Sequence, residues 1–280
     1  MRLRSIFAWI PAASVALAAN FPGVGPKAEL WERWLAHDAA SSIQVDHSAW
    51  GDFLSKYLVR GDDGVNRLRY AAVTPADRKA LDDYLGRLSA MRVSRLRRAE
   101  QLPFWINFYN ALTVRVVLDH YPVNSILRIN VSPGLFAVGP WGKKLVLVEG
   151  EMLSLDDIEH RILRPIWRDP RIHYAVNCAS VGCPNLAAAP YTAETADAML
   201  TEGARAYVNH PRGARVADFG PVVSSIYRWY KEDFGGTDAG VLAHLRSHAG
   251  PELAGRLAKV SRVVDHEYDW SLNDASEPRD

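Results

Sequence analysis

The segment DPRIHYAVNCASVGCPNLAAA, residues 169–189, contains both cysteines of the 280-residue chain, Cys178 and Cys183, and a nearby histidine, His173. A short apolar run around the histidine leads through small residues to Cys183 and Pro184. This order predicts a strand, a tight turn and the start of a helix. Because N–H groups at a helix N-terminus favour a thiolate, we expect Cys183 to be the more reactive thiol.

The stretch from residue 102 to residue 120 predicts a helix that is buried all round, because it is apolar on nearly every side. Asn107 and Asn110 lie one turn apart on one face of this helix. A buried carboxamide without a partner costs about 1–3 kcal/mol, so both imply specific hydrogen bonds. They could hold a neighbouring backbone segment such as the cysteine loop, or one of them could orient a catalytic group or stabilise an oxyanion.

A second polar group is expected on the helix that begins after Ser154. Asp156, His160 and Arg164 are spaced at i, i+4 and i+8, so they share one face. This spacing is typical of a ladder of surface charges. The alternative is that His160, together with Glu159, lines a cleft.

Capping signals, helical periodicity and short β-like runs alternate along the rest of the chain, without an internal repeat. The pattern predicts one α+β domain over residues 19–273, with mixed helices around a small, largely antiparallel sheet and a strand-loop-helix unit that carries the cysteines. The polar residues 274–280 are expected to be a disordered tail.

The first 18 residues have the features of a secretory signal peptide. Arg2 and Arg4 precede an apolar run over residues 6–18 that ends in Ala16-Leu17-Ala18. The run is shorter than the roughly 20 residues of a membrane-spanning helix, so no stable membrane span is expected. The sequence therefore predicts a periplasmic or secreted protein, in an environment that permits a disulfide.

A net charge of +1 gives the chain no global attraction for nucleic acid, and its aromatic residues are not interleaved with Lys and Arg. We therefore expect no nucleic-acid partner. A small-molecule or peptide substrate fits the composition better, and no motif indicates a cofactor.

Several stretches resemble a family known as domain of unknown function 547. The motifs that carry the resemblance are FWINFYNALTV (104–114), SLDDIEHRILR (154–164) and DPRIHYAVNCASVGCPNL (169–186), with weaker matches in SIYRWYKEDF (225–234) and YDWSLN (268–273). The resemblance implies a domain but no reaction. It places these residues at family motif positions: Asn107, Asn110, Glu159, His160, Arg164, His173, Cys178 and Cys183.

The function that we favour from the sequence is a cysteine-dependent hydrolase or acyl transferase that acts on an amide or acyl bond through a thioester. Cys183 would be the nucleophile and His173 the general base, with Asn107 or Asn110 as the orienting or oxyanion group. His160 is the other candidate base and Asn177 another candidate orienting group.

Three alternatives remain open for the two cysteines. A Cys178–Cys183 disulfide would close the loop of a non-catalytic binding module, although so small a ring gains little stability. His173, Cys178 and Cys183 could bind a metal with His160 as a fourth ligand, although the spacing is wide for zinc. A redox dithiol is the last alternative, without the C-x-x-C geometry of thioredoxin-type sites.

Overall fold

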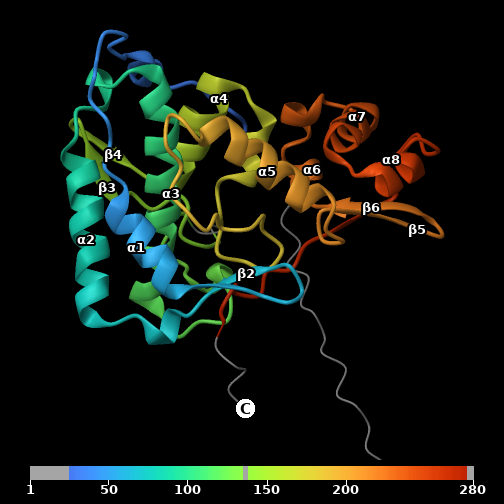
Figure 1. Ribbon diagram of the computed structural model, residues 1–280, viewed down its shortest axis with the longest axis horizontal. Coiled ribbons are helices and arrows are strands. Elements are labelled where there is room, and N and C mark those ends of the chain that lie inside the picture. The colour runs from blue at the N-terminus through green and yellow to red at the C-terminus, as the bar shows by residue number, and fades with distance from the viewer. Residues whose placement is uncertain (1–24, 135–137, 276–280) are drawn as a thin grey trace, which may run out of the picture.

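The computed structural model describes residues 25–134 and 138–275 (Figure 1). The predicted signal peptide, residues 1–18, and residues 276–280 of the predicted tail lie outside these ranges. The beginning of that tail is held in place, because the Ala275 amide donates to the carbonyl of Leu68 over 2.9 Å. Asp274 also forms a parallel bridge to Leu68.

The described residues form eight α-helices and three small sheets, which confirms the predicted α+β class. The helices are α1 (Ser48–Tyr57), α2 (Pro75–Ala90), α3 (Arg98–His120), α4 (Arg164–Trp167), α5 (Ala196–Val208), α6 (Ile226–Trp229), α7 (Asp238–His248) and α8 (Pro251–Leu257). The strands are β1 (Leu58–Arg60), β2 (Asn66–Leu68), β3 (Val146–Val148), β4 (Glu151–Leu153), β5 (Ala214–Ala217), β6 (Gly220–Ser224) and β7 (Asp265–Glu267). Within the described ranges, no helix combines the length and apolar character needed to cross a membrane.

Helix α3 is the centre of the larger hydrophobic core, as its apolar sequence predicts. Helices α1 and α2, the β3–β4 hairpin and the segment around α4 surround it (Figure 1). The rings of Trp105 and Phe104 are fully enclosed and pack edge to face, 4.9 Å between centroids. A helix buried on every side needs partners for its polar residues as well, and α3 finds them for both asparagines.

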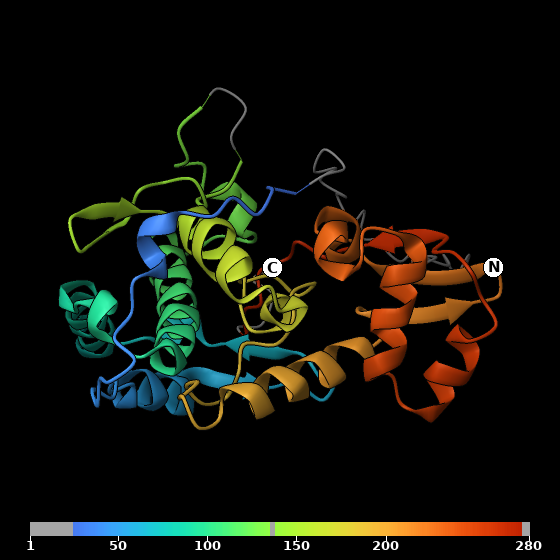
Figure 2. The same ribbon diagram turned by 90° about the horizontal axis from the view of Figure 1, so that it is seen from above.

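A second core lies beside the first and is built from α5 to α8 and the sheet of β5, β6 and β7. Figure 2 shows these elements on one side of the molecule, with α5 running from the α3 side towards them. The 3₁₀-helix Pro170–Tyr174 joins the two cores, because Ile172 packs in the first and Tyr174 in the second. The cysteine segment therefore begins where the two cores meet.

The sheet arrangement differs from the prediction of one largely antiparallel sheet. Strands β1–β2 and β3–β4 are separate antiparallel hairpins, and β5–β6–β7 is a third sheet whose β6–β7 pair is parallel. Helices α1 and α2 consequently pack around α3, whereas α5 to α8 pack with the three-stranded sheet in the second core. Short turns join the two strands of each antiparallel pair.

The predicted strand-loop-helix unit is wrong. Asp169 accepts a hydrogen bond from the Arg171 amide and Pro170 follows the cap, so a 3₁₀-helix replaces the strand. No helix begins at Pro184, whose carbonyl accepts a hydrogen bond from the Asn177 side chain. The cysteines lie in an irregular loop whose backbone groups are satisfied by side chains and by a distant segment.

That distant segment is the C-terminal stretch 268–273. The Val181 amide donates to Ser271 O and the Gly182 amide to Asp269 O, each over 2.8 Å. Gly182 allows this approach because a Cβ there would lie 2.6 Å from the Asp269 nitrogen. The C-terminal stretch thus forms one wall of the cysteine loop.

We predict that Gly182→Ala destabilises the protein by about 1–3 kcal/mol, because backbone atoms must move to accept the methyl group. Gly86→Ala is the matched control, since no atom lies within 4 Å of a Cβ at this position inside α2. Alanine there should stabilise the helix by up to about 1 kcal/mol. Equilibrium unfolding in urea measures both changes, and equal effects of the two substitutions would refute the close approach.

Candidate functional site

A cavity of about 420 Å³ opens where the cysteine loop meets the two cores. Its acidic, histidine and cysteine side chains come from two parts of the chain: the π-helix Asp157–Leu163 with the residue before it, and the cysteine segment. Ser132, Tyr109 and residues of the C-terminal third complete the polar lining. Aromatic residues form much of the remaining wall. A partly apolar cavity with a few convergent polar groups is the usual form of a small-molecule site.

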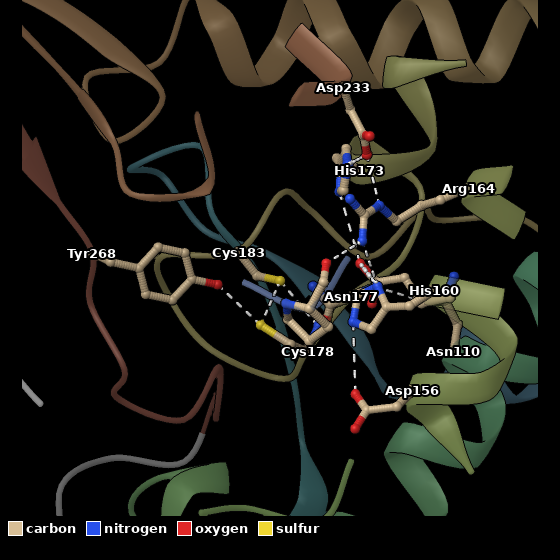
Figure 3. A network of polar contacts seen from close by, with 12 residues as sticks. Asn110, Asp156, His160, Arg164, His173, Asn177, Cys178, Cys183, Asp233 and Tyr268 are labelled. Carbon is tan, nitrogen blue, oxygen red and sulfur yellow. Dashed lines mark hydrogen bonds and ion pairs between the residues drawn. The ribbon is translucent and has the colours of Figure 1, made fainter. Parts of the chain in front are cut away.

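Both sulfur atoms line this cavity, and they are free thiols 2.8 Å apart. Cys178 Sγ also lies 3.0 Å from the Tyr268 hydroxyl and 3.2 Å from the Ser180 hydroxyl (Figure 3). The residue between the cysteine and the serine, Ala179, has a φ of 57°, which non-glycine residues seldom adopt. This left-handed turn brings the serine hydroxyl back to the sulfur.

The two thiols differ strongly in acidity. Burial alone would raise the pKa of Cys178, but hydrogen bonds from Cys183 and the two hydroxyls outweigh burial and lower the pKa to about 7. Burial and the neighbouring Cys178 sulfur raise the pKa of Cys183 well above its ordinary value. The helix that was expected to activate Cys183 does not form, so the physical reason for preferring this thiol is removed.

Glu159 and His160 reach the cavity from a π-helix, a wide turn that often occurs at functional sites. Burial raises the pKa of Glu159 to about 7, against the opposing effects of the Arg164 charge and a hydrogen bond from Tyr109. The nearby Cys178 contributes to the same upward shift. A substantial fraction of Glu159 is thus protonated at neutral pH, beside a thiol that is substantially ionised.

His173 lies against Glu159 but hydrogen-bonds elsewhere. Its Nε2 atom is 2.7 Å from Asp233 Oδ2, and its ring stacks on Tyr230 with centroids 4.4 Å apart. In the neutral ring, which burial favours, the proton on Nε2 is donated to Asp233, so Nδ1 carries the lone pair and faces Glu159 Oε1 at 3.7 Å. Burial lowers the pKa of His173, against the effect of Asp233. The structure thus connects His173 to the acid Glu159 and not directly to a thiol, in contrast to the predicted role as base.

Arg164 fixes the second imidazole and the carboxylate of Asp233. Its Nη1 donates to His160 Nδ1 over 3.0 Å, and its Nε donates to Asp233 Oδ2 over 2.6 Å. An arginine cannot accept a proton, so His160 must carry its own proton on Nε2, 3.6 Å from Asp156 Oδ1. Burial and the arginine charge hold the pKa of His160 well below its ordinary value. His160 is therefore neutral, and the expected surface ladder is instead a buried network (Figure 3).

The asparagines hold backbone and do not line the cavity. Asn107 exchanges two hydrogen bonds with the backbone of Tyr191, at 2.8 and 3.0 Å. Asn110 bonds Ala175 O and the Asn177 amide, both at 2.8 Å. The orienting or oxyanion role predicted for Asn107 or Asn110 is not supported, whereas the alternative that they hold the neighbouring backbone is. The oxygen and the NH₂ group of each carboxamide are already engaged in these hydrogen bonds.

Asn177 has the same kind of role inside the loop itself. Its Nδ2 donates to Pro184 O over 2.7 Å, and its Oδ1 accepts from the Ala179 amide over 2.9 Å. These bonds draw the two ends of the cysteine loop together. Among the described residues, no three His, Cys, Asp or Glu side chains are grouped so that they could hold a metal ion, so the predicted set of His173, Cys178 and Cys183 is not assembled as one.

Residues 93–208 match the family described as "Protein of unknown function, DUF547". This segment is a DUF547 domain. The matched segment contains α3, the π-helix, the cysteine loop and α5. No curated protein and no solved structure gave a match to the chain.

Three groups of the DUF547 site were missed from the sequence: Ser180, Asp233 and Tyr268. The last two follow the segment that matches the family, 60 residues after His173 and 90 residues after Cys178 respectively. The available signal was the pair of weaker motif stretches, 225–234 and 268–273, which contain one of these residues each. Their polar residues could have been treated as candidates together with the cysteines.

We predict that Asn110→Ala destabilises this DUF547 protein by about 2–4 kcal/mol, because it leaves a buried carbonyl and a buried amide without partners. Asn107→Ala should cost a similar amount, since it removes an equivalent pair of bonds. Only Asn110→Ala should also change the rate at which iodoacetamide alkylates Cys178, because only Asn110 holds the loop. Urea unfolding and alkylation rates measure the two effects. Identical alkylation rates in both variants would contradict the prediction that only Asn110 holds the cysteine loop.

The pH dependence of alkylation gives a second prediction. Iodoacetamide should react with Cys178 with a midpoint near pH 7, the pKa of its thiol. Tyr268→Phe removes a donor that stabilises the thiolate, so the midpoint should rise by roughly one pH unit. Tyr84→Phe is the matched control, because that hydroxyl bonds His47. An unchanged midpoint in Tyr268→Phe would show that the hydroxyl does not stabilise the thiolate.

Proposed function

We propose that this DUF547 protein is a cysteine-dependent acyl transferase or hydrolase in which Cys178 is the nucleophile. The observation that carries the proposal is the pairing of a thiol whose pKa is lowered to about 7 with a carboxyl whose pKa is raised to about 7, in one cavity. Groups whose environments shift their pKa values in opposite senses are typical of nucleophile and acid-base partners.

The proposed reaction begins when the Cys178 thiolate attacks the carbonyl carbon of an ester or amide. The hydroxyls of Tyr268 and Ser180 flank the sulfur and can donate to the oxyanion that develops there. Protonated Glu159 gives its proton to the leaving alcohol or amine, and a thioester remains on Cys178. The Glu159 carboxylate then removes a proton from the incoming water or amine, whose attack releases the acyl group and restores the thiolate.

His173 and His160 are positioning residues in this proposal. Their Nδ1 atoms lie 3.7 and 3.8 Å from Glu159 Oε1, and both rings are neutral. Two neutral imidazoles do not stabilise a carboxylate as two cations would, so the acid keeps its raised pKa. We also propose export to the periplasm or outside the cell, on the basis of the N-terminal sequence.

A second candidate function is thiol–disulfide exchange, which the 2.8 Å separation of the two sulfur atoms favours. The Cys178 thiolate would attack a disulfide of a partner and release one partner thiol. Cys183 would then attack the mixed disulfide, release the second thiol and leave a Cys178–Cys183 bridge. The same bridge would close the loop in a purely binding protein.

The model acyl donor p-nitrophenyl acetate tests the first proposal. The wild type and Cys183→Ser should both carry an acetyl group on Cys178 by mass spectrometry and turn the ester over, whereas Cys178→Ser should do neither. Glu159→Gln should accumulate the acetylated enzyme, with hydrolysis slowed by roughly 10²–10⁴-fold. Glu151→Gln, at a half-buried position at the start of β4 and outside the cavity lining, is the matched control.

Two results would contradict the acyl-transfer proposal. Acetylation of Cys183 in place of Cys178 would exclude Cys178 as the nucleophile. Acetylation of Cys178 without turnover, together with a requirement for both cysteines in the reduction of an aromatic disulfide, would transfer the assignment to thiol–disulfide exchange.

A further inference from the structure

Aromatic rings from three separate segments form one side of the cavity. Trp270 lies at their centre, with ring centroids 4.6 Å from Tyr268, 5.5 Å from Trp229 and 5.9 Å from Trp141. The interplanar angles of these pairs are 52°, 32° and 67°, so the rings are tilted to one another and do not form one flat stack. All four residues line the cavity.

The ionisable side chains that line the cavity are acidic, or are neutral histidines. Asp156 and Glu159 line it, and none of the described lining residues is a lysine or an arginine. The nearest guanidinium that contacts the network, Arg164, is tied to Asp233 and to the carbonyl of Pro26. The donation from Arg164 to Nδ1 requires a neutral His160, and burial lowers the pKa of His173, so neither histidine of the lining adds a positive charge at neutral pH.

Asp156 is the more accessible of the two carboxylates. Its side chain is 40 % exposed, whereas that of Glu159 is only 8 % exposed. Asp156 Oδ1 lies 3.6 Å from His160 Nε2, too far for a strong hydrogen bond. This carboxylate can therefore turn towards a ligand, while Glu159 remains inside the network.

We propose that the cavity recognises a substrate that carries an organic ammonium group, seated between the aromatic wall and the Asp156 carboxylate. The faces of indole and phenol rings attract cations because of their quadrupoles, and a nearby carboxylate adds a direct charge interaction. A phosphate or carboxylate would instead meet two acidic side chains and no cation among the described lining residues. The inference rests on the proposed function, since it describes the substrate of the same Cys178 site.

The consequence for the reaction is that the acyl compound, or the amine that accepts the acyl group, is cationic. The aromatic wall reaches the sulfur directly, because Tyr268 belongs to the wall and also contacts Cys178. A bound ammonium group would then lie close to the scissile bond. Neutral acyl donors such as p-nitrophenyl acetate would still react, but without this added affinity.

Choline and its uncharged isostere 3,3-dimethylbutan-1-ol test the inference, because they differ in the replacement of nitrogen by carbon. Titration of the wild-type protein, followed by tryptophan fluorescence and calorimetry, should show choline binding at least about tenfold more tightly. Asp156→Asn should remove most of this preference and leave binding of the alcohol unchanged. Glu151→Gln is the control for a general loss of negative charge.

Equal binding of choline and the alcohol by the wild type, or binding of neither, would overturn the inference, even if Asp156→Asn failed to fold. Tighter binding of acetate or phosphate would overturn it as well. Acylation of Cys178 is measured in a different experiment, so failure of the ammonium site can be distinguished from failure of the proposed reaction. Acylation without a preference for choline removes only the cation site, whereas a choline preference without acylation removes only the proposed reaction.

Discussion

The site depends on the anchoring of one irregular loop from two sides. On one side, the Asn110 carboxamide of α3 holds the backbone at Ala175 and Asn177. On the other side, the C-terminal stretch 268–273 pairs with the loop around Gly182. Without regular secondary structure, the buried polar groups of the loop need such partners, and satisfying them fixes both sulfur atoms in space. The acidity of Cys178 is a consequence of this fixed geometry.

The ionisable groups of the cavity depend on one another. Hydrogen bonds stabilise the Cys178 thiolate, while burial destabilises the Glu159 carboxylate, so an ionised thiol and a protonated carboxyl group coexist near neutral pH. Burial keeps both histidines neutral, while Arg164 donates to His160 Nδ1 and Asp233 accepts from His173 Nε2, so no imidazolium lies beside the acid at neutral pH. The aromatic wall excludes water from one side, which strengthens each of these electrostatic effects.

Local sequence predicted those parts of the fold that local interactions decide. The buried helix predicted over residues 102–120 is present as α3, which begins four residues earlier, at Arg98. The segment before Cys178 was predicted wrongly as a strand, because its backbone is satisfied by a side chain of α3 that periodicity cannot reveal. For the same reason the sequence identified the cysteines as a pair but offered no local feature by which to choose Cys178. The acidity of Cys178 depends on Tyr268, which is 90 residues away in the chain.

An NMR titration of the protein with isotope-labelled cysteine Cβ atoms tests the central claim most directly, since it reports each thiol separately in the intact cavity. The account predicts that the Cys178 signal moves with a midpoint near pH 7. The Cys183 signal should remain that of a protonated thiol until well above the ordinary value of about 8.5. Ionisation of Cys183 first, or a common midpoint for both thiols near the ordinary value, would contradict it.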